Sequence, residues 1–315
     1  MRSLAVPTAV LSMLLSALVL AAHRYEPEHQ GESPSTLKKI GVLLVNHGSR
    51  SSTWRQALLD LEREVTEPLR RGGIVKEVRT AFMEYTEPSI ATQLKAFDAS
   101  GYTDVIIVPL FLTVSTHSFD DIPTIIGAKE DAHSLEALKL EKIERYTPRA
   151  RVRITPLLDF TSVLQENVLN RVKKLSRRPS EEGLVLIAYG DQTYSQEWSD
   201  LLKKVADFVK HNTGITDYSY GWCGHVARYS PDATTAAIRE VLTTKTTAIV
   251  IPVLVARDEM FQVQIIADGI NKIPDAKSKV RYRPDAILPD AHIERWVIQI
   301  ASTYADKAHH GIAMD

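Results

Sequence analysis

Cysteine is scarce in this sequence, and neither sign of charge is in clear excess. Cys223 is the single cysteine among 315 residues, which excludes a disulfide framework, a cysteine-rich zinc site and an iron–sulfur cluster. The 38 basic and 39 acidic residues give a net charge of −1. No overall positive field therefore exists to hold nucleic acid, and we expect no nucleic-acid partner. A mononuclear metal site built from histidines and carboxylates stays open.

Motifs for nucleotide binding and for acyl transfer are missing as well. No GxGxxG or GxxxxGKS/T segment follows an apolar run, which argues against a nucleotide-dependent enzyme. No GxSxG segment is present, although Ser49, two positions after His47, leaves a hydrolase open. Cys223 and His225 lie two positions apart, which is a poor spacing for a nucleophile and its base.

The N-terminal segment differs in character from the rest of the chain. Residues 1–22 carry one charged side chain, Arg2, followed by an uncharged apolar run over residues 4–22. This pattern is typical of a secretory signal peptide, with an uncleaved membrane tether as the alternative. Residues 23–37 are polar, contain two prolines and read as a linker. We therefore expect the remaining chain to be exported, lying in the periplasm or anchored with its domains outside the cytoplasm.

From residue 38 onward, apolar runs alternate with amphipathic segments in a way that predicts an α/β fold. Strands are expected at residues 40–45, 75–82, 105–112 and 152–157, and helices at residues 54–69, 88–99 and 160–175. Strands that are nearly continuous in apolar residues and separated by helices indicate a parallel sheet covered on both faces.

The second half of the chain repeats the first. Tyr189-Gly190 stands 142 positions after His47-Gly48, and IVIPVLV (249–255) stands 143 positions after IIVPLFL (106–112). An extra segment around residues 127–150 interrupts the repeat in the first half. We therefore predict two tandem domains related by duplication, at residues 38–178 and 179–315, with the boundary in the charged stretch 176–183.

Polar side chains follow three strands of the first predicted sheet, at the edge where ligands bind in open parallel sheets. His47 follows the first strand, Glu84 and Glu87 follow the second, and His117 follows the third. Two imidazoles and one or two carboxylates at one edge suit a divalent metal or acid–base chemistry. Each also has a structural explanation: a histidine can be a hydrogen-bonded loop residue, and Glu84 or Glu87 can lie at a helix N-terminus.

Three segments, VNHGSR (45–50), FMEYTEPSI (82–90) and VPLFLTVSTHSFDDIP (108–123), resemble the signature blocks of the class II tetrapyrrole chelatases. This is the sirohydrochlorin cobaltochelatase and ferrochelatase group related to CbiX. The first predicted domain resembles the short, single-domain members, and the whole chain resembles the long members with two such units. The resemblance implies a metal chelatase, a lyase, of either the cobalamin or the siroheme branch.

The resemblance also implies roles for individual residues. His47 corresponds to the first metal ligand and a proton acceptor, and His117 to the second metal ligand. Glu87 corresponds to an acid that contacts the tetrapyrrole, and Glu84 is close enough to share the handling of protons. The loop expected to border the macrocycle comprises Leu112, Thr113, Val114, Ser115, Thr116 and His117.

The second predicted domain departs from this pattern. Tyr189 stands where the first histidine is expected, and the segment Arg257-Asp258-Glu259-Met260 lies where the second is expected. We therefore expect a degenerate site there and a single active site in the chain. Because the implied substrate carries many carboxylates, cations should border the cleft, and Arg50 and Arg257 lie in the loops where they could do so.

The sequence thus predicts insertion of Co2+, Fe2+ or possibly Ni2+ into sirohydrochlorin or a related tetrapyrrole, with the metal as substrate and no organic cofactor. An exported tetrapyrrole or metal carrier without turnover is the alternative, and a metallohydrolase is a third interpretation. Histidine and glutamate ligands do not select one metal. Duplication would let a monomer imitate the dimer of short members, and a homodimer stays open.

Overall fold

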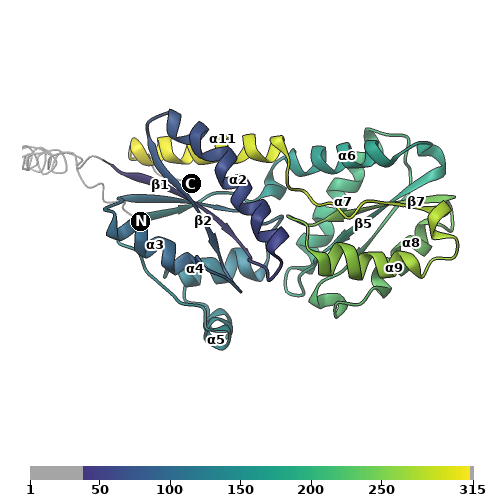
Figure 1. Ribbon diagram of the computed structural model, residues 1–315, viewed down its shortest axis with the longest axis horizontal. Helices are drawn as coiled ribbons and strands as arrows, with labels where there is room; N and C mark the ends of the chain where they lie inside the picture. The colour runs from purple at the N-terminus through teal and green to yellow at the C-terminus, as the bar shows by residue number, and fades with distance from the viewer. Residues whose placement is uncertain (1–37, 313–315) are drawn as a thin grey trace, which may run out of the picture. The chain divides into compact units, whose positions relative to one another are not determined.

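Two parallel four-stranded sheets with the same strand order organise the described part of the chain (Figure 1). The computed structural model describes residues 38–312, so the predicted segments 1–22 and 23–37 lie outside the described residues. The first sheet has the order β2-β1-β3-β4 and the second the order β6-β5-β7-β8. The strands are β1 (Ile40–Asn46), β2 (Val75–Phe82), β3 (Asp104–Pro109), β4 (Arg151–Ile154), β5 (Glu182–Ala188), β6 (Tyr218–Trp222), β7 (Thr247–Val253) and β8 (Val280–Tyr282). The α/β class and the internal duplication are confirmed.

Helices cover both faces of each sheet. The central strands β1 and β5 are therefore buried along their whole length. One face of the first sheet packs on α2 (Ser52–Arg71), and the other packs on α3 (Ile90–Ala99) and α4 (Ile122–Ile125). In the second sheet, α7 (Ser195–His211) covers one face, and α8 (Asp232–Val241) and α9 (Ala267–Asn271) cover the other.

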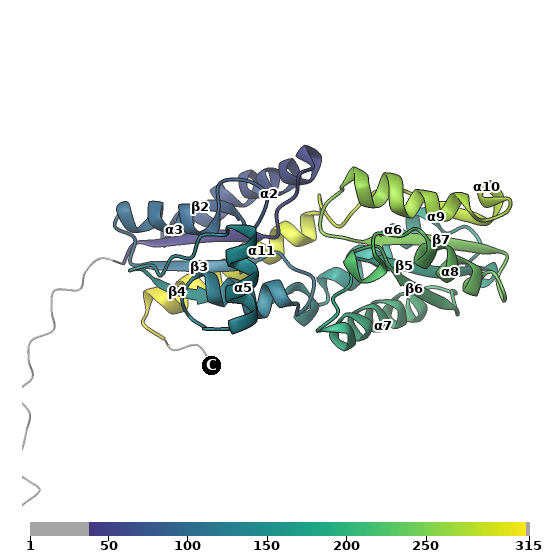
Figure 2. The ribbon, with the colours of Figure 1, turned by 90° about the horizontal axis from the view of Figure 1, so that it is seen from below.

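Two long helices pack on the sheet of the opposite half. Helix α6 (Val163–Leu175) closes the first half in sequence but contacts β7 and α7, and α11 (Ala291–His309) closes the second half but contacts α2, β1 and β3 (Figures 1 and 2). Arg171 of α6 donates to the carbonyl of Pro252 at 2.8 Å. Residues Lys38–Asp315 form one compact unit. The boundary at 178/179 therefore stays a prediction, which divides the two repeats in the sequence.

The segment around residues 127–150 holds one helix, α5 (Ala132–Glu141), at the periphery of the first half (Figures 1 and 2). Its counterpart in the second half is the single turn α10 (Ala276–Lys279). Strand β3 ends at Pro109, three residues earlier than expected, and the following Leu110–Leu112 are buried in a loop. Within residues 38–312, the chain forms no helix with both the length and the apolar character needed to cross a membrane.

Candidate metal site and cleft

His47 and Glu84 meet because the pairing of β1 with β2 continues past the ends of both strands. The amide of Glu84 donates to the carbonyl of His47 at 2.8 Å. The chain then turns sharply at Gly48, where φ is +95° and a Cβ atom would lie 2.1 Å from the carbonyl oxygen of Glu84. Only glycine tolerates both this conformation and this approach. The HG pair of the sequence therefore sets the position of the imidazole against the carboxylate.

His117 reaches the same edge from a short π-helix, η1 (Thr116–Asp121), which follows β3. Ser115 and Ser118 form a capping box at its start. π-helical turns are rare in proteins, and those that occur are often found at functional sites. The rings of His47 and His117 lie 4.7 Å apart, edge to face, with an interplanar angle of 77°.

Glu84 completes a three-residue cluster with these histidines. One ligand atom from each of His47, Glu84 and His117 lies within 4.8 Å of the other two. Two imidazole nitrogens and one carboxylate oxygen form a donor set suited to divalent metals of the middle of the first transition series. The three residues that the sequence placed at separate strand ends are therefore brought together.

Hydrogen bonds orient both imidazoles toward a common point. Nδ1 of His47 lies 3.0 Å from the carbonyl oxygen of Gly48, which can only accept. Nδ1 of His117 lies 2.8 Å from Oδ2 of Asp121. When each Nδ1 carries a proton for these bonds, each Nε2 presents a lone pair, as a metal ligand requires.

The two histidines differ in their affinity for protons. Burial, followed by the nearby His117, lowers the pKa of His47 to about 4, so that His47 is neutral at pH 7. Burial also opposes protonation of His117. The hydrogen bond to Asp121 and the negative charges of Glu84, Asp121 and Asp191 outweigh this effect, and the pKa of His117 is raised.

Sequence reasoning missed two carboxylates at the cluster. The sequence analysis assigned no role to Asp121. This residue stands four positions after His117, which places the two on one face of a helical turn. Glu141 is the last residue of α5, and its carboxyl group interacts electrostatically with that of Glu84. Burial, and then the bond to Glu84 and its charge, raise the pKa of Glu141 to about 7.

Other predicted residues lie apart from the cluster. Glu87 is exposed, and its carboxylate accepts from the amide of Ser89, the N-cap of α3, at 2.5 Å. This contact fits the helix-terminus interpretation of Glu87. Arg257 pairs with Glu259 at 3.6 Å and lines a neighbouring cavity instead of the one beside the histidines. Arg50 does line the cavity beside the histidines and lies over the ring of Tyr85 at 5.3 Å.

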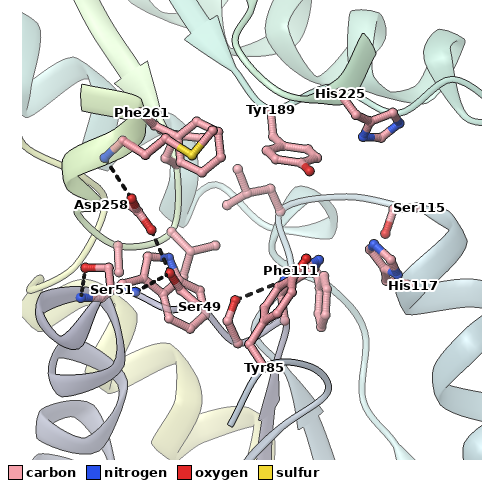
Figure 3. A pocket seen from close by; sticks show the side chains of 18 of the residues that line it. Ser49, Ser51, Tyr85, Phe111, Ser115, His117, Tyr189, His225, Asp258 and Phe261 are labelled. Carbon is pink, nitrogen blue, oxygen red and sulfur yellow. Dashed lines mark hydrogen bonds between the residues drawn. The ribbon is translucent and has the colours of Figure 1, made fainter. Parts of the chain in front are cut away.

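A cavity of about 580 Å³ opens beside the two histidines and is lined by both halves of the chain (Figure 3). This volume lies in the range of small-molecule sites. Figure 3 shows Tyr85 and Phe111 on one wall and Tyr189 and Phe261 on the opposite wall. Leu112, Ser115 and His117 of the predicted loop line it, whereas Thr113 is buried and bonded to Asp159 at 2.6 Å.

Hydrogen bonds between the halves hold this cleft on two sides. The hydroxyls of Ser49 and Ser51 donate to Asp258 and Glu259 at 2.6 and 2.7 Å. On the other side, the amide of Thr116 donates to Asp191 at 3.2 Å. The second half thus supplies acids that fix the loops carrying His47 and His117.

The equivalent positions of the second half lack metal ligands of this kind. Tyr189 precedes Gly190 (φ +84°) as His47 precedes Gly48, and the amide of Gly224 donates to the carbonyl of Tyr189 at 3.1 Å as that of Glu84 does to His47. Met260 follows the N-cap of the second π-helix, η5 (Glu259–Ile266), by two positions, as His117 follows Ser115. The neighbouring Cys223 is buried, and burial raises the pKa of its thiol, which makes a nucleophilic role a poor fit.

Comparisons with known proteins point to one family. A model of the CbiX family matches residues 41–175. The sirohydrochlorin cobaltochelatase of Methanopyrus kandleri is 32% identical over 141 residues, which cover 43% of this chain and 96% of that protein. The sirohydrochlorin cobaltochelatase of Saccharolobus solfataricus is 29% identical over 136 residues, covering 43% of this chain and 94% of the relative.

Solved structures with two such halves share the fold of this chain. The sirohydrochlorin chelatase SirB from Bacillus subtilis subspecies spizizenii, in complex with cobalt, superposes with a TM-score of 0.61 at 18% identity, covering 88% of this chain and 100% of that one. CbiX, described as the terminal enzyme for biosynthesis of siroheme in denitrifying bacteria, gives a TM-score of 0.53 at 15% identity, covering 85% and 98%.

Proposed function

Because the chain belongs to the CbiX family of metal chelatases, we propose that it inserts a divalent metal ion into sirohydrochlorin at the cluster of His47, Glu84 and His117. One observation carries the proposal: the three ligand atoms lie within 4.8 Å of one another, and both histidines face a cavity lined by aromatic rings. Metal and macrocycle are the two substrates that such an arrangement brings together.

The metal substrate would be held by Nε2 of His47, Nε2 of His117 and the carboxylate of Glu84. His47 is ready to bind at neutral pH because its pKa is lowered to about 4. His117 must first lose the proton that its raised pKa favours, and Asp121 keeps its ring in place while it does so. Co2+, Fe2+ and Ni2+ all suit this donor set, and we propose Co2+ or Fe2+ as the metal.

The tetrapyrrole would lie in the cleft, against the aromatic walls. The phenol groups of Tyr189 and Tyr229 are 3.3 Å apart on the wall of the second half, and Tyr85 is half exposed on the wall of the first half. Flat aromatic side chains bind a flat conjugated ring through a large contact area. Holding metal and ring in one orientation converts an encounter of two substrates into a reaction within one complex.

Insertion releases two protons from the pyrrole nitrogens, since a divalent metal replaces two N–H hydrogens. A neutral His47 whose pKa is lowered to about 4 is a weak acceptor for them. Glu84 lies at the cluster, and we propose that its carboxylate takes up one of the two protons, as a positioned base does in proton transfer, while the second passes to solvent in the open cleft. Glu87 is exposed at the N-terminus of α3, and its carboxylate accepts from the amide of Ser89. We therefore do not propose Glu87 as this base.

An absorption assay tests this function. Purified full-length protein mixed with sirohydrochlorin and Co2+, Fe2+ or Ni2+ should change the tetrapyrrole spectrum faster than the spontaneous reaction does. A protein that binds tetrapyrrole and metal but never exceeds the spontaneous rate would be a carrier, and the enzymatic proposal would be rejected.

We also propose that the catalytic part acts outside the cytoplasm as a monomer. The uncharged run over residues 4–22 supports export or a membrane tether, and the presence of both cleft walls in one chain supports a monomer. Fusion of residues 1–36 to a reporter that is active only after export tests the first point, and an inactive reporter would refute it. A dimer in size-exclusion chromatography with light scattering would refute the second.

A further inference from the structure

His225 places an imidazole on the wall of the cleft that belongs to the second half. It follows Gly224, begins the short 3₁₀-helix η4 (His225–Ala227) and lines the same cavity as His47 and His117. We propose that His225 is an axial ligand of the metal once the metal lies in the tetrapyrrole, on the face opposite His47 and His117. This inference rests on the proposed function and gives the second half a role in holding the product.

The two halves present the same pair of rings to the cleft, with histidine and tyrosine exchanged. In the first half, the ring centroids of His47 and Tyr85 lie 5.8 Å apart. In the second half, those of Tyr189 and His225 lie 5.5 Å apart, and Figure 3 shows these two residues together on one wall. Tyr85 and His225 are equivalent, because each directly follows the residue whose amide donates to the carbonyl of the other member of its pair. The second half therefore presents an imidazole to the cleft, at the second position of the pair.

The imidazole of His225 is available to a ligand. Its side chain is exposed, and in the described part of the chain no hydrogen bond engages the ring, whereas each histidine of the metal cluster has a bonded Nδ1. The neighbouring phenol groups of Tyr189 and Tyr229 bond to each other at 3.3 Å. Met260 also lines the cavity, but its thioether is a soft ligand suited to Cu(I), whereas imidazole suits iron and its neighbours in the first transition series. His225 is therefore the side chain of this wall best suited to a metal in the ring.

The backbone around His225 holds the imidazole beside Tyr189. A Cβ atom at Gly224 would lie 2.6 Å from the carbonyl oxygen of Tyr189, so glycine brings this loop close against the wall. The amide of Tyr229 donates to the carbonyl of Gly224 at 3.0 Å, and that of Arg228 to the carbonyl of His225 at 2.8 Å. Arg228 and Tyr229 adopt left-handed φ angles of 51° and 55°, which large side chains rarely do and which recur at ligand clamps. The loop is thus closed tightly on itself next to the cavity.

A metal ion in a tetrapyrrole has one axial position on each face of the ring, and imidazole is a common protein ligand there. As the four bonds to the ring nitrogens form, the bonds from the metal to His47 and His117 break, and the two pyrrole protons leave as proposed above. A ring nitrogen of His225 then donates its lone pair from the other face, and the metal keeps its charge. His225 belongs to no cluster of three ligand residues in the described part of the chain, so the macrocycle must supply the other ligands.

The test is electron paramagnetic resonance of the full chain mixed with Co2+-sirohydrochlorin, prepared in advance and kept free of oxygen. An axial nitrogen ligand splits the cobalt lines into triplets, and the experiment does not depend on insertion. The variant is His225→Ala, with His211→Ala as matched control. His211 lies in the same half at the end of α7, is exposed and is not among the described residues that line the cavity. Circular dichroism checks the fold of each variant.

We expect triplets in the wild type and in His211→Ala, and their loss in His225→Ala. The affinity of His225→Ala for Co2+-sirohydrochlorin should fall about tenfold, which corresponds to about 1.4 kcal/mol, while its affinity for metal-free sirohydrochlorin should stay within about twofold of wild type. The triplets should persist in His117→Ala, because the axial nitrogen comes from the opposite wall.

Triplets that persist in His225→Ala or vanish in His117→Ala would assign the axial nitrogen to the first half and overturn the proposal. A wild-type spectrum without nitrogen splitting would overturn it as well, as would equal losses of affinity in His225→Ala and His211→Ala. If the wild type catalyses no insertion, the proposed function fails, while the spectra still decide whether His225 binds the metal of the product.

Discussion

The hydrogen bond between His117 and Asp121 offers a quantitative test of the metal site. Asp121 is 4% exposed, and its Oδ2 lies 2.8 Å from Nδ1 of His117. In Asp121→Asn the side chain keeps its size but loses its charge. Its amide group can donate to Nδ1, which moves the ring proton to Nε2 and removes the lone pair from the cluster.

The expected loss follows from the strength of the bond. Hydrogen bonds to charged groups contribute about 1.5–3 kcal/mol, and every 1.4 kcal/mol corresponds to about a factor of ten in affinity. We therefore expect Asp121→Asn to weaken Co2+ binding about 10- to 100-fold at pH 8, with the fold intact. Asp120→Asn is the matched control, because Asp120 is the neighbour of Asp121 in the chain but accepts from the hydroxyl of Tyr194 at 2.8 Å.

The pH dependence supplies a second readout, with a defined sign. The pKa of His117 is raised above its usual 6.5, so the proton competes with the metal below that pKa and affinity falls as the pH falls through it. Without the charge and bond of Asp121 the pKa of His117 drops, and the inflection should move to lower pH. The assay is titration with Co2+ between pH 6 and 8.5, followed by absorption. An unchanged affinity and inflection in Asp121→Asn would refute this account of His117.

Three further outcomes follow from the site and from the equivalent positions of the second half. Gly48→Ala should abolish metal binding and lower the melting temperature, because its Cβ would lie 2.1 Å from the carbonyl oxygen of Glu84; a fully active variant would contradict the turn geometry. Glu87→Gln should leave kcat for insertion unchanged within twofold, since Glu87 is exposed at a helix start; a large drop in kcat would return it to the machinery. Tyr189→His should create no second Co2+ site, because Gly224 and Met260 still lack a carboxylate and an imidazole; two sites by titration would contradict the degeneracy of the second half.

The sequence was sufficient to predict the sheets and the meeting of His47, Glu84 and His117. Apolar runs have a length that fits parallel strands, and the ends of such strands converge at one edge, so periodicity alone brings residues from separate motifs together. The His-Gly pair at 47–48 and the Tyr-Gly pair at 189–190 marked the same turn in both halves, which is why the repeat was visible.

Long-range placement could not be read from the sequence. Helices α6 and α11 have apolar faces that fit either sheet, and only the packed structure shows that each lies on the opposite half. Glu141 interacts electrostatically with Glu84 and His117 from the end of α5, a position that no spacing in the chain encodes. The π-helical turn places Asp121 below His117, whereas the sequence suggested a loop. Glu87 and Arg257 carried the right chemistry, but local partners, the amide of Ser89 and the carboxylate of Glu259, hold them elsewhere.

The central claim is that His47 and His117 hold the metal that enters the tetrapyrrole. The most direct measurement is the initial rate of Co2+ insertion into sirohydrochlorin by His47→Ala and His117→Ala, at saturating tetrapyrrole and with binding of the tetrapyrrole confirmed by its absorption. The account predicts that each variant binds the macrocycle, retains its fold and inserts Co2+ no faster than the spontaneous reaction. A rate near that of the wild type in either variant, with tetrapyrrole still bound, would contradict it.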